Sequence, residues 1–466
     1  MNITVFERNG YIGGRTTTID AYGGPGNPVE VGGSIFVEVN RILTDAAKEF
    51  NLSTGGLHSS TGSVPGASLG VWDGQKFVIT QNSDNLTWWD SAKFLWKYGL
   101  APIRTMRLMR LTVGKFLKMY DEPHFPFSSL SEVAIDVGLV GTTAATGEQF
   151  MAENGITGEF GHDVVQASTR VNYAQNLKHI NGLLAMVCMA AEGGRSVEGG
   201  NWQIFDNMLL ASGATVHLGT NVTSVKKVPK EGWVLTYTPN DDATMDVREQ
   251  SFDSVILASP HQFANVDLPD LQQVPDEIPY VTLHVTLFTS PHLLSPTFFN
   301  MPSGEPAPKV ILTTLPPNEV PKEGAEEVGS PGFFSISLLQ PVTNPQTGAG
   351  EYLYKIFSPG PTNATFLSHL LGVRDFNEEE LSNKDVTWIY RKVWRSYPYE
   401  IPRVTFEQTK LDSDGLWYTG GMDSFISTME TNSLMGRNIA RLIVNEWTEE
   451  PTVKNFEGVM AMTEVF

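Results

Sequence analysis

The sequence contains a single cysteine, Cys188, among 466 residues. One cysteine excludes an intrachain disulfide and any zinc or iron–sulfur site that needs several thiolate ligands. Cys188 lies inside the longest apolar run, residues 182–191, so we expect a buried core thiol. A bilayer-spanning helix needs about twenty apolar residues, and this run is too short. The sequence therefore predicts no integral membrane span.

Positive charge is also scarce. Lysine and arginine number 32 against 52 aspartate and glutamate residues, which gives a formal net charge of −20 at pH 7. Phosphate backbones need clustered positive charge, so the composition argues against a nucleic-acid partner. The nine histidines are scattered without the spacing of a metal site, and we expect no metal. Hydrophobic residues make up 41% of the chain, an ordinary globular mixture.

Targeting signals are few. The first residues have no basic start followed by an apolar core, so no signal peptide is expected in the sequence as it stands. Five Asn-x-Ser/Thr sequons permit a secretory route without supporting it; they lie at Asn2, Asn51, Asn85, Asn221 and Asn363.

Hydrophobic patterning predicts alternating strands and helices. Short apolar runs predict strands at 3–6, 215–218, 222–225, 253–258 and 416–421, and helical spacing predicts helices at 41–50, 202–211 and 433–447. Asp73-Gly74 suits the tight turn of a hairpin over 71–79. The stretch 300–350 is dense in proline and glycine and is expected to form a loop or hairpin region. Residues 89–120 look helical and combine Trp, Leu, Met and Arg, as a packed helical layer, a pocket wall or a membrane-contact face would.

The strongest local signal opens the chain, where a strand ending at Glu7 is followed by Arg8 and by Gly13-Gly14-Arg15. A carboxylate at the end of such a strand can accept hydrogen bonds from both hydroxyls of an adenosine ribose. The two glycines let the backbone approach a pyrophosphate, and Arg15 supplies the countercharge. Downstream, Gly32-Gly33-Ser34 offers a second close approach, as the edge of a flavin ring requires. We therefore expect cofactor contacts along these segments.

In this order and spacing, the segments resemble the second strand and Gly-Gly-Arg motif of the flavin-dependent amine-oxidase superfamily. The end of the chain is similar too, with Asp423 after two glycines, Met429 six residues later and Gly436-Arg437 beyond. The resemblance implies that FAD is the cofactor and that Asp423 holds its ribityl chain or pyrophosphate. It also implies that the helix starting near Met429 faces the flavin's pyrimidine ring and that Val222 packs near the adenine.

Within this superfamily the chain is most similar to the prenylcysteine oxidase family, also called prenylcysteine lyase. The matching segments run through the chain in order, at residues 96–100, 170–175, 196–201, 354–358 and 394–398. The resemblance implies FAD-dependent oxidation of farnesyl- or geranylgeranyl-cysteine by oxygen, during breakdown of prenylated proteins. The implied products are an isoprenoid aldehyde, free cysteine and hydrogen peroxide. Because the flavin carries the hydride step, the resemblance names no catalytic side chain; it implies a lysosomal, vacuolar or secretory location and leaves a peripheral membrane contact open.

One departure from the superfamily concerns the nucleotide-binding sheet. Its members open with a strand and Gly-x-Gly-x-x-Gly about twenty-five residues before the acidic strand end, whereas six residues precede Glu7 here. Two interpretations follow: the sequence is an incomplete version of a longer protein, or the chain binds FAD poorly or not at all.

The predicted fold class is α/β, with a discontinuous Rossmann-like FAD-binding domain and an inserted α+β substrate domain. The FAD domain is predicted to comprise residues 1–80, 195–260 and 410–450, and the substrate domain residues 81–194 and 261–409. In the substrate part, Tyr173 and Gln175 either face the substrate or belong to an internal hydrogen-bond network.

Other functions remain open on the sequence alone. One is a flavin oxidase of the same fold that acts on an amine or a polyene, and another is a lipid-binding relative without cofactor. Gly66-Ala-Ser68-Leu-Gly70 matches the Gly-x-Ser-x-Gly motif of serine hydrolases, but a loop precedes it and a hairpin follows. That motif needs a strand before it and a helix after it, so we do not expect a hydrolase.

Overall fold

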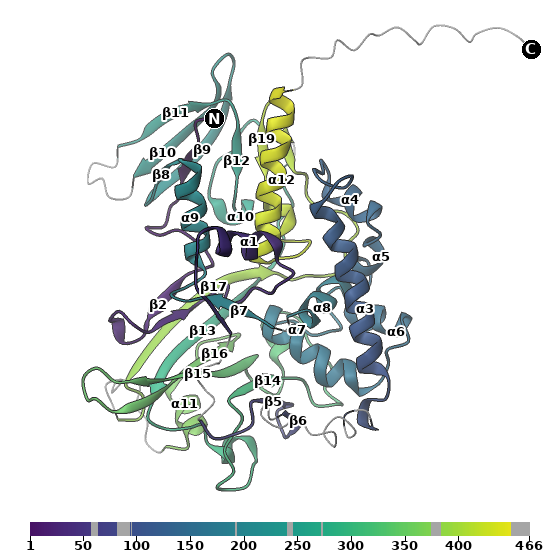
Figure 1. The fold of residues 1–466 in the computed structure, drawn as a ribbon, viewed down its shortest axis with the longest axis vertical. Helices are drawn as coiled ribbons and strands as arrows, with labels where there is room; N and C mark the ends of the chain where they lie inside the picture. Colours follow the sequence, from purple (N-terminus) through teal and green to yellow (C-terminus); the bar gives the residue numbers. More distant parts are fainter. Residues whose placement is uncertain are drawn as a thin grey trace, which may run out of the picture.

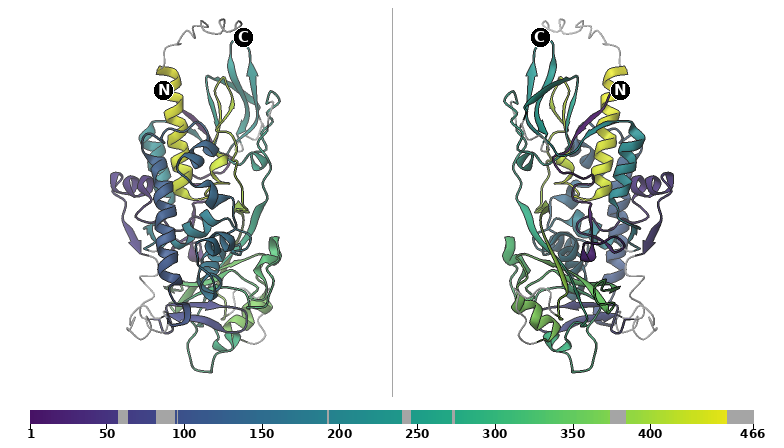
Figure 2. Two further views of the ribbon diagram at one scale, coloured as in Figure 1. Left: turned by 90° about the vertical axis from the view of Figure 1, so that its right-hand side faces the viewer. Right: turned by 90° about the vertical axis from the view of Figure 1, so that its left-hand side faces the viewer.

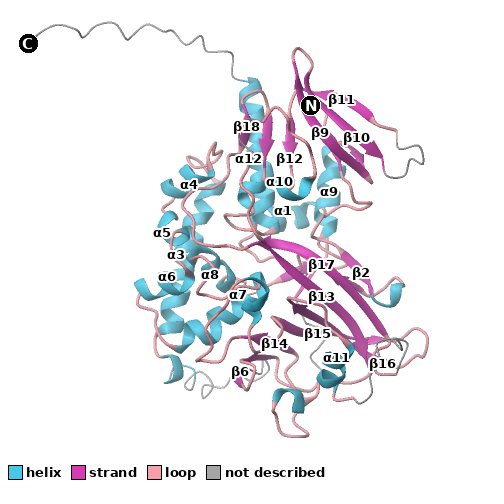
Figure 3. Cartoon of the chain, turned by 180° about the vertical axis from the view of Figure 1, so that it is seen from behind, coloured by secondary structure: helices cyan, strands magenta, loops and turns pink. Residues whose placement is uncertain are grey.

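The computed structural model describes residues 1–56, 64–81, 94, 96–191, 193–239, 246–271, 274–373 and 384–448. Its parts lie along one long axis, with a large sheet and a set of smaller sheets toward opposite ends (Figures 1 and 2). A layer of helices flanks the large sheet on one side (Figure 3).

The large sheet has seven strands in the order β17-β13-β16-β15-β14-β5-β6. Neighbours are antiparallel except β14 and β5, which are parallel. The strand bounds are β5 Leu69–Trp72, β6 Phe77–Gln81, β13 Tyr280–Ser290, β14 Val310–Thr313, β15 Ser335–Thr343, β16 Gly350–Ser358 and β17 Trp388–Pro398. The central strands are buried on both faces because helices and loops cover them.

The expectation of a loop or hairpin region over 300–350 is wrong in part, because β14 and β15 in this stretch are inner strands of the large sheet. Ile311, Ile336 and Leu338 are almost completely buried there. The proline and glycine residues fall mostly between the strands. The composition of this stretch therefore indicates its turns and gives no sign of its strands. The hairpin over 71–79 is confirmed as β5 and β6, with Gly74 at φ +94°.

The helical layer holds the largest core cluster of the protein. It contains α3 Ala101–Phe116, α4 Leu130–Asp136, α5 Val140–Thr143, α6 Gly147–Glu153, α7 Gln166–Tyr173 and α8 Gly182–Met189. Helix α8 is the apolar run of the sequence, and six of its eight residues are buried, Cys188 among them. It starts where the Asn181 side chain accepts a hydrogen bond from the Leu184 amide at 3.0 Å. The thiol is therefore part of the core, as expected.

The predicted helix over 89–120 is divided in the structure. Residues 94 and 96–98 are helical, the chain turns at Gly99 with φ +56°, and α3 begins at Ala101 with proline in its first turn. Residues 89–93 and Leu95 lie outside the described residues. The inner side of α3 buries Thr105, Met109 and Phe116 against the core, so a packed helical layer is confirmed for that side.

The small sheets and the helices beside them form what we call the small-sheet region. Parallel β1 Thr4–Phe6 and β8 Thr215–His217 form one pair, and β12 Val255–Leu257 is parallel to β19 Leu416–Tyr418, which is followed outward by β18 Lys410–Asp412. A three-stranded meander consists of β9 Thr220–Val228, β10 Gly232–Pro239 and β11 Arg248–Phe252. The helices are α1 Arg41–Glu49, α9 Trp202–Ser212, α10 His261–Ala264 and α12 Met429–Thr448.

The helices and strands predicted for this region are confirmed, with one shift. Helix α9 stops at Gly213 with φ +66°, as the sequence indicates. Helix α12 begins at Met429, four residues before the predicted start at 433, because Thr428 and Thr431 exchange hydrogen bonds that form its first turn. Two short ladders, β2 Thr18–Asp20 with β3 Pro28–Glu30 and β4 Thr54–Gly56 with β7 Arg195–Val197, lie between this region and the large sheet.

The parallel strands of the small-sheet region do not form one continuous sheet within the described residues. β1 pairs only with β8, and β12 pairs only with β19. Ile256 in β12 is 44% exposed, which is unusual for the middle of a short apolar parallel strand. The predicted domain division stays a prediction. Strand β5 in segment 1–80, however, pairs with β14 of segment 261–409.

No helix in the described part of the chain is long and apolar enough to cross a membrane. The remaining helix, α11 Ala364–Leu371, packs against the large sheet and is capped by Asn363.

Candidate functional site

Glu7 lies directly after β1, at the carboxyl end of the β1–β8 pair. One of its carboxylate oxygens accepts hydrogen bonds from the Asn9 amide at 2.7 Å and from the Asn9 side chain at 2.6 Å. Val222 in β9 belongs to the same apolar cluster as Phe6, so the structure places it near this strand end. Arg8 donates a hydrogen bond to the Phe263 carbonyl at 2.8 Å. Three predicted cofactor contacts, Glu7, Arg8 and Val222, therefore share one neighbourhood.

Gly13 and Gly14, the predicted pyrophosphate contacts, form a tight turn with φ +111° and +57°. A Cβ atom on Gly13 would lie 2.1 Å from the Thr16 carbonyl oxygen, and the Thr16 amide donates to the Gly13 carbonyl at 2.8 Å. Only glycine fits this turn. The turn leads directly into Arg15 and fixes where that side chain starts.

Arg15 and Asp423 form an ion pair across 408 residues of sequence, with Nη2 at 2.8 and 3.1 Å from the two carboxylate oxygens. Asp423 is only 2% exposed and also accepts hydrogen bonds from the Tyr280 hydroxyl at 3.0 Å and the Asn432 amide at 2.9 Å. Burial lowers the pKa of the Arg15 guanidinium, but the Asp423 charge outweighs it and the net shift is upward. Arg15 is therefore a fixed positive charge at this point of the molecule.

Gly32 and Gly33 lie against the backbone of Arg15, and the Ser34 hydroxyl donates to the Gly32 carbonyl at 2.8 Å. The Gly33 amide donates to the Arg15 carbonyl at 2.9 Å, and a Cβ on Gly32 would lie 1.8 Å from that same oxygen. A Cβ on Gly33 would lie 3.1 Å from the sulfur of Met429, the first residue of α12. The structure thus brings together Arg15, Gly32, Gly33, Ser34, Asp423 and Met429, and we call these six residues the glycine–arginine cluster.

Lys355 in β16 is a site residue that the sequence reasoning missed. Its ammonium group donates to the Ser34 hydroxyl oxygen at 2.9 Å and to the Glu30 carbonyl at 2.8 Å, and the residue is 8% exposed. Burial lowers the pKa of Lys355 to about 8, against a smaller upward effect of Glu30. A lysine inside the otherwise apolar, buried run 353–357 was the signal that could have revealed it.

Glu30, at the end of β3, is the acidic neighbour of this lysine. One carboxylate oxygen accepts from the Asn201 amide at 2.6 Å, and the other is buried without a partner among the described residues. Burial raises the pKa of Glu30 to about 7, although the Asn201 hydrogen bond and Lys355 pull it down. The Asn201 side chain also donates to the Gly33 carbonyl at 3.1 Å. This hydrogen bond connects segment 196–201, one of the segments that resemble the family, to the glycine–arginine cluster.

A polar cavity of about 340 Å³ opens beside Glu30. Its walls come from the β2–β3 hairpin, the loop around Gly199 and Gly200, and Gln340 and Pro341 of the large sheet. The cavity therefore lies at the junction of the glycine-rich segments and the large sheet.

Tyr173 and Gln175, the predicted substrate contacts, are buried in internal hydrogen bonds. The Gln175 side chain donates to the Pro398 carbonyl at 3.1 Å and accepts from the Glu400 amide at 2.9 Å. The Tyr173 hydroxyl donates to the Ser427 carbonyl at 3.1 Å, and its ring lies 5.1 Å from that of Tyr397. Of the two interpretations, substrate contact or internal hydrogen-bond network, these contacts favour the internal network. They join α7 to β17 and to the loop before α12.

Glu400 is a second buried acid that the sequence reasoning missed. It is 1% exposed, and both carboxylate oxygens lack a partner among the described residues. Burial, with the negative charge of Asp423, raises the pKa of Glu400 well above its usual value. Burial therefore favours the protonated form of Glu400, whose carboxyl group lies within electrostatic reach of Asp423 and Arg15.

The residues present fit the flavin end of FAD. The Arg15 guanidinium is paired with Asp423, so it is the amino end of the long helix α12, whose first residue Met429 lies against Gly33, that favours a negatively charged ligand. The buried, unpartnered oxygen of Glu30 and the Lys355 amine supply polar groups at the same place. The predicted contacts thus lie in two groups, one at Glu7 and one at the glycine–arginine cluster, joined by residues 8–14.

Two other chemistries find no support in the described residues. No group of three or more His, Cys, Asp or Glu side chains is placed to hold a metal ion there. Gly66 to Gly70 runs from a loop into β5 and not from a strand into a helix, so the geometry of a serine-hydrolase elbow is absent from these residues.

Comparison with protein families gives a match to prenylcysteine lyase over residues 81–455. A farnesylcysteine lyase of Arabidopsis thaliana is 29% identical and aligns over 97% of this chain and 84% of its own length. Prenylcysteine oxidase 1 of Mus musculus is 25% identical and aligns over 96% of this chain and 84% of its own length. Prenylcysteine oxidase 1 of Homo sapiens is 23% identical and aligns over 98% of this chain and 86% of its own length.

Solved structures share the fold at low sequence identity. Cyclohexylamine oxidase from Brevibacterium oxydans IH-35A superposes with a TM-score of 0.58 at 15% identity, over 96% of this chain and 94% of its own. A putrescine oxidase redesigned in its cofactor binding superposes with a TM-score of 0.56 at 13% identity, over 95% of this chain and 93% of its own. The predicted fold class, a Rossmann-like domain with an inserted α+β domain, is therefore confirmed.

Proposed function

The chain belongs to the prenylcysteine lyase family, and from this membership and the glycine–arginine cluster we propose that it is an FAD-dependent thioether oxidase that cleaves prenylcysteine. The substrates are farnesyl- or geranylgeranyl-cysteine, oxygen and water. The products are the isoprenoid aldehyde, free cysteine and hydrogen peroxide. The carbon–sulfur bond breaks, the carbon loses two electrons and gains the water oxygen, and oxygen takes the two electrons with two protons.

Bound FAD would supply the two-electron acceptor for the allylic carbon and pass the electrons to oxygen. We assign its flavin end to Gly32, Gly33, Ser34, Asp423 and Met429, its pyrophosphate to Gly13, Gly14 and Arg15, and its adenosine to Glu7, Arg8 and Val222. The contacts of the glycine–arginine cluster support the first two assignments, and the position of Val222 beside β1 supports the third.

Lys355 is the group of this chain best suited to hold or move a proton. Its Nζ atom touches Ser34 Oγ, and a pKa of about 8 lets it change protonation near neutral pH. We propose that it gives or takes a proton beside the flavin edge. The Glu30 carboxyl group, with a pKa of about 7, is a second group near Lys355 that can change protonation near neutral pH.

The deciding experiment is a visible absorption spectrum of the purified chain, taken before and after anaerobic addition of farnesylcysteine. We expect flavin bands that lose intensity with farnesylcysteine, and later farnesal and hydrogen peroxide in equal amounts on admission of oxygen. The matched control substrate is S-dodecylcysteine, which keeps the thioether but lacks the allylic double bond that stabilises the developing cation. Flavin bands unaffected by farnesylcysteine would contradict the proposal.

The two alternatives from the sequence remain outcomes of the same experiment. Bands that respond to an alkylamine or a polyene and not to the thioether would indicate a related oxidase, and the amine-oxidase neighbours share the fold for such chemistry. A colourless chain that cannot be reconstituted but binds farnesylcysteine would indicate a cofactor-free lipid-binding relative. The separate pairing of β1 and β12 is the observation that keeps this second alternative in view.

We further propose a lysosomal, vacuolar or secretory location, where prenylated proteins are degraded. Family membership supports it, and the sequons at Asn51 and Asn363 lie at exposed positions. Fluorescence microscopy of the tagged full-length gene product, with lysosomal or vacuolar markers, tests this location.

A further inference from the structure

The outer side of residues 94–118 is unlike the rest of this acidic protein. Between residues 94 and 120 the sequence has six basic and no acidic side chains, in a chain whose formal net charge is −20. All six are exposed; they are Lys97, Arg104, Arg107, Arg110, Lys115 and Lys118. We call the exposed side of residues 94 and 96–118 the basic face.

Large apolar side chains are exposed on the same face. Trp96 is 90% exposed, Ile103 63%, Leu111 57% and Leu100 56%. Every exposed residue of α3 is Ile, Leu, Gly, Arg or Lys. Isolated exposed hydrophobic residues are ordinary, but here Ile103 and Leu111 are interleaved with arginines along α3, and Trp96 and Leu100 lie in the segment just before it.

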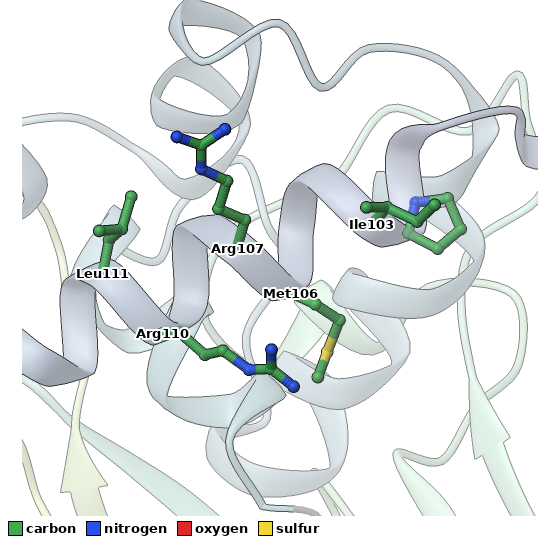
Figure 4. A pocket seen from close by; sticks show the side chains of 6 residues that line it. Ile103, Met106, Arg107, Arg110 and Leu111 are labelled. Carbon is green, nitrogen blue, oxygen red and sulfur yellow. The ribbon is translucent and has the colours of Figure 1, made fainter.

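Helical geometry accounts for this arrangement. Ile103, Arg107, Arg110 and Leu111 are spaced three or four residues apart and lie on the side opposite to Thr105 and Phe116, which are buried. Figure 4 shows the side chains of Ile103, Arg107, Arg110 and Leu111 along one stretch of α3, with the two arginines diverging from each other. A surface hollow of about 490 Å³ is lined there only by side chains of α3.

The arginines at the centre of the basic face are available for a partner. Lys97 pairs with Asp163, Arg104 donates to the Gly155 carbonyl and Lys115 to the Gly138 carbonyl. By contrast, no ion pair within the described residues joins Arg107 or Arg110 to an acidic side chain. Their positive charge is therefore not neutralised on the protein.

We propose that the basic face docks on the surface of a bilayer that contains anionic lipids. A helix lying in a membrane interface combines Lys and Arg with Trp, Leu and Ile, and this face has that combination. Trp96 suits the headgroup level, and the arginine side chains can keep their charge among headgroups while Ile103 and Leu111 enter the acyl boundary. A nucleic acid would satisfy the charges and leave the apolar side chains in water.

The rest of the molecule orients this contact. The chain is acidic elsewhere, so an anionic surface repels its other faces and attracts this one. Helix α3 is already held by the core through its inner side, so docking needs no folding of the helix. The interaction is separate from the proposed catalysis and can be tested without turnover.

The test is co-sedimentation of the purified full chain with vesicles of phosphatidylcholine, with and without phosphatidylserine. We expect binding only to the anionic vesicles, and less binding as salt is raised. Each basic residue near an anionic surface strengthens binding about five- to sixfold. The double variant Arg107→Gln with Arg110→Gln should therefore weaken the vesicle partition about 30-fold. The matched control removes two exposed lysines elsewhere, Lys48→Gln with Lys226→Gln, and should bind like the wild type.

Two further measurements separate the apolar part from the charges and from self-association. Ile103→Ser with Leu111→Ser should weaken vesicle binding, whereas Leu210→Ser on α9, also exposed, should not. Equal binding to neutral and anionic vesicles, no binding to either, or unchanged binding of the arginine variant would overturn the proposal. So would a dimer in sedimentation equilibrium that the arginine variant dissociates, because the face would then join two copies of this chain.

Discussion

Lys355 gives the sharpest prediction, because its burial changes both stability and chemistry. The pKa of about 8, against 10.5 for a free lysine, means that the folded chain disfavours the charged form. At about 1.4 kcal/mol per pKa unit, the charge costs about 3 kcal/mol of stability at neutral pH. We therefore expect Lys355→Met to unfold at higher denaturant concentration at pH 7, even though the contacts to Ser34 and Glu30 are lost.

The sign of the pH dependence follows from proton binding in the two states. Between pH 8 and about 10.5 the unfolded lysine keeps its proton and the folded one has lost it, so the free energy of unfolding rises with pH. Integration of this difference predicts that the wild type gains about 2 kcal/mol relative to Lys355→Met between pH 8 and pH 10. Groups that titrate alike in both proteins cancel in the comparison.

The assay is urea unfolding of both proteins at several pH values, followed by tryptophan fluorescence. Lys226→Met, at an exposed position of β9, is the matched control and removes one lysine far from the buried site. A stability difference between wild type and Lys355→Met that stays constant from pH 8 to pH 10 would refute the reasoning. In turnover assays the same variant should lose the pH dependence that Lys355 confers, whereas Lys226→Met should keep it.

Three further predictions concern the cofactor contacts. Glu7→Ala should weaken FAD binding by about 2 kcal/mol, about 30-fold, in a flavin titration, because a charged acceptor for the ribose is lost; unchanged affinity would remove Glu7 from the site. Gly32→Ala places a Cβ atom 1.8 Å from the Arg15 carbonyl oxygen and should lower both melting temperature and flavin content. Gly10→Ala, where nothing lies within 4 Å, should change neither, and equal behaviour of the two variants would contradict the geometry. Asp423→Asn should cost about 2 kcal/mol in urea unfolding, because Arg15 loses its charged partner; a variant as stable as the wild type would show that the ion pair contributes nothing.

Local elements were predictable where a short stretch of sequence determines its own conformation. The hairpin of β5 and β6 follows from an Asp-Gly turn between apolar runs, and α9 ends at Gly213 because glycine adopts φ +66° without strain. By contrast, β14 and β15 were hidden in a proline- and glycine-rich region. They are strands because distant partners pair with them, and such pairing leaves little trace in the local sequence.

The candidate site was predictable in the same uneven way. The sequence by itself indicated Glu7, Gly13, Gly14 and Arg15 as candidate contacts, because their types and spacing lie within one short segment. It could not show that Lys355 meets Ser34 or that Glu400 is buried beside the Arg15–Asp423 pair. Each of these contacts joins residues more than 300 positions apart in the chain or depends on burial by several elements.

The basic face shows the same division between sequence and tertiary structure. The sequence determined that residues 94–120 carry only positive charge; it favoured a packed helical layer and left a pocket wall or a membrane-contact face as alternatives. Tertiary packing decided which side of α3 is buried, because Thr105, Met109 and Phe116 meet the core while Ile103, Arg107 and Leu111 are exposed. The sequence determines which side chains the helix carries. Which of them face solvent depends on the neighbouring elements that cover one side of the helix.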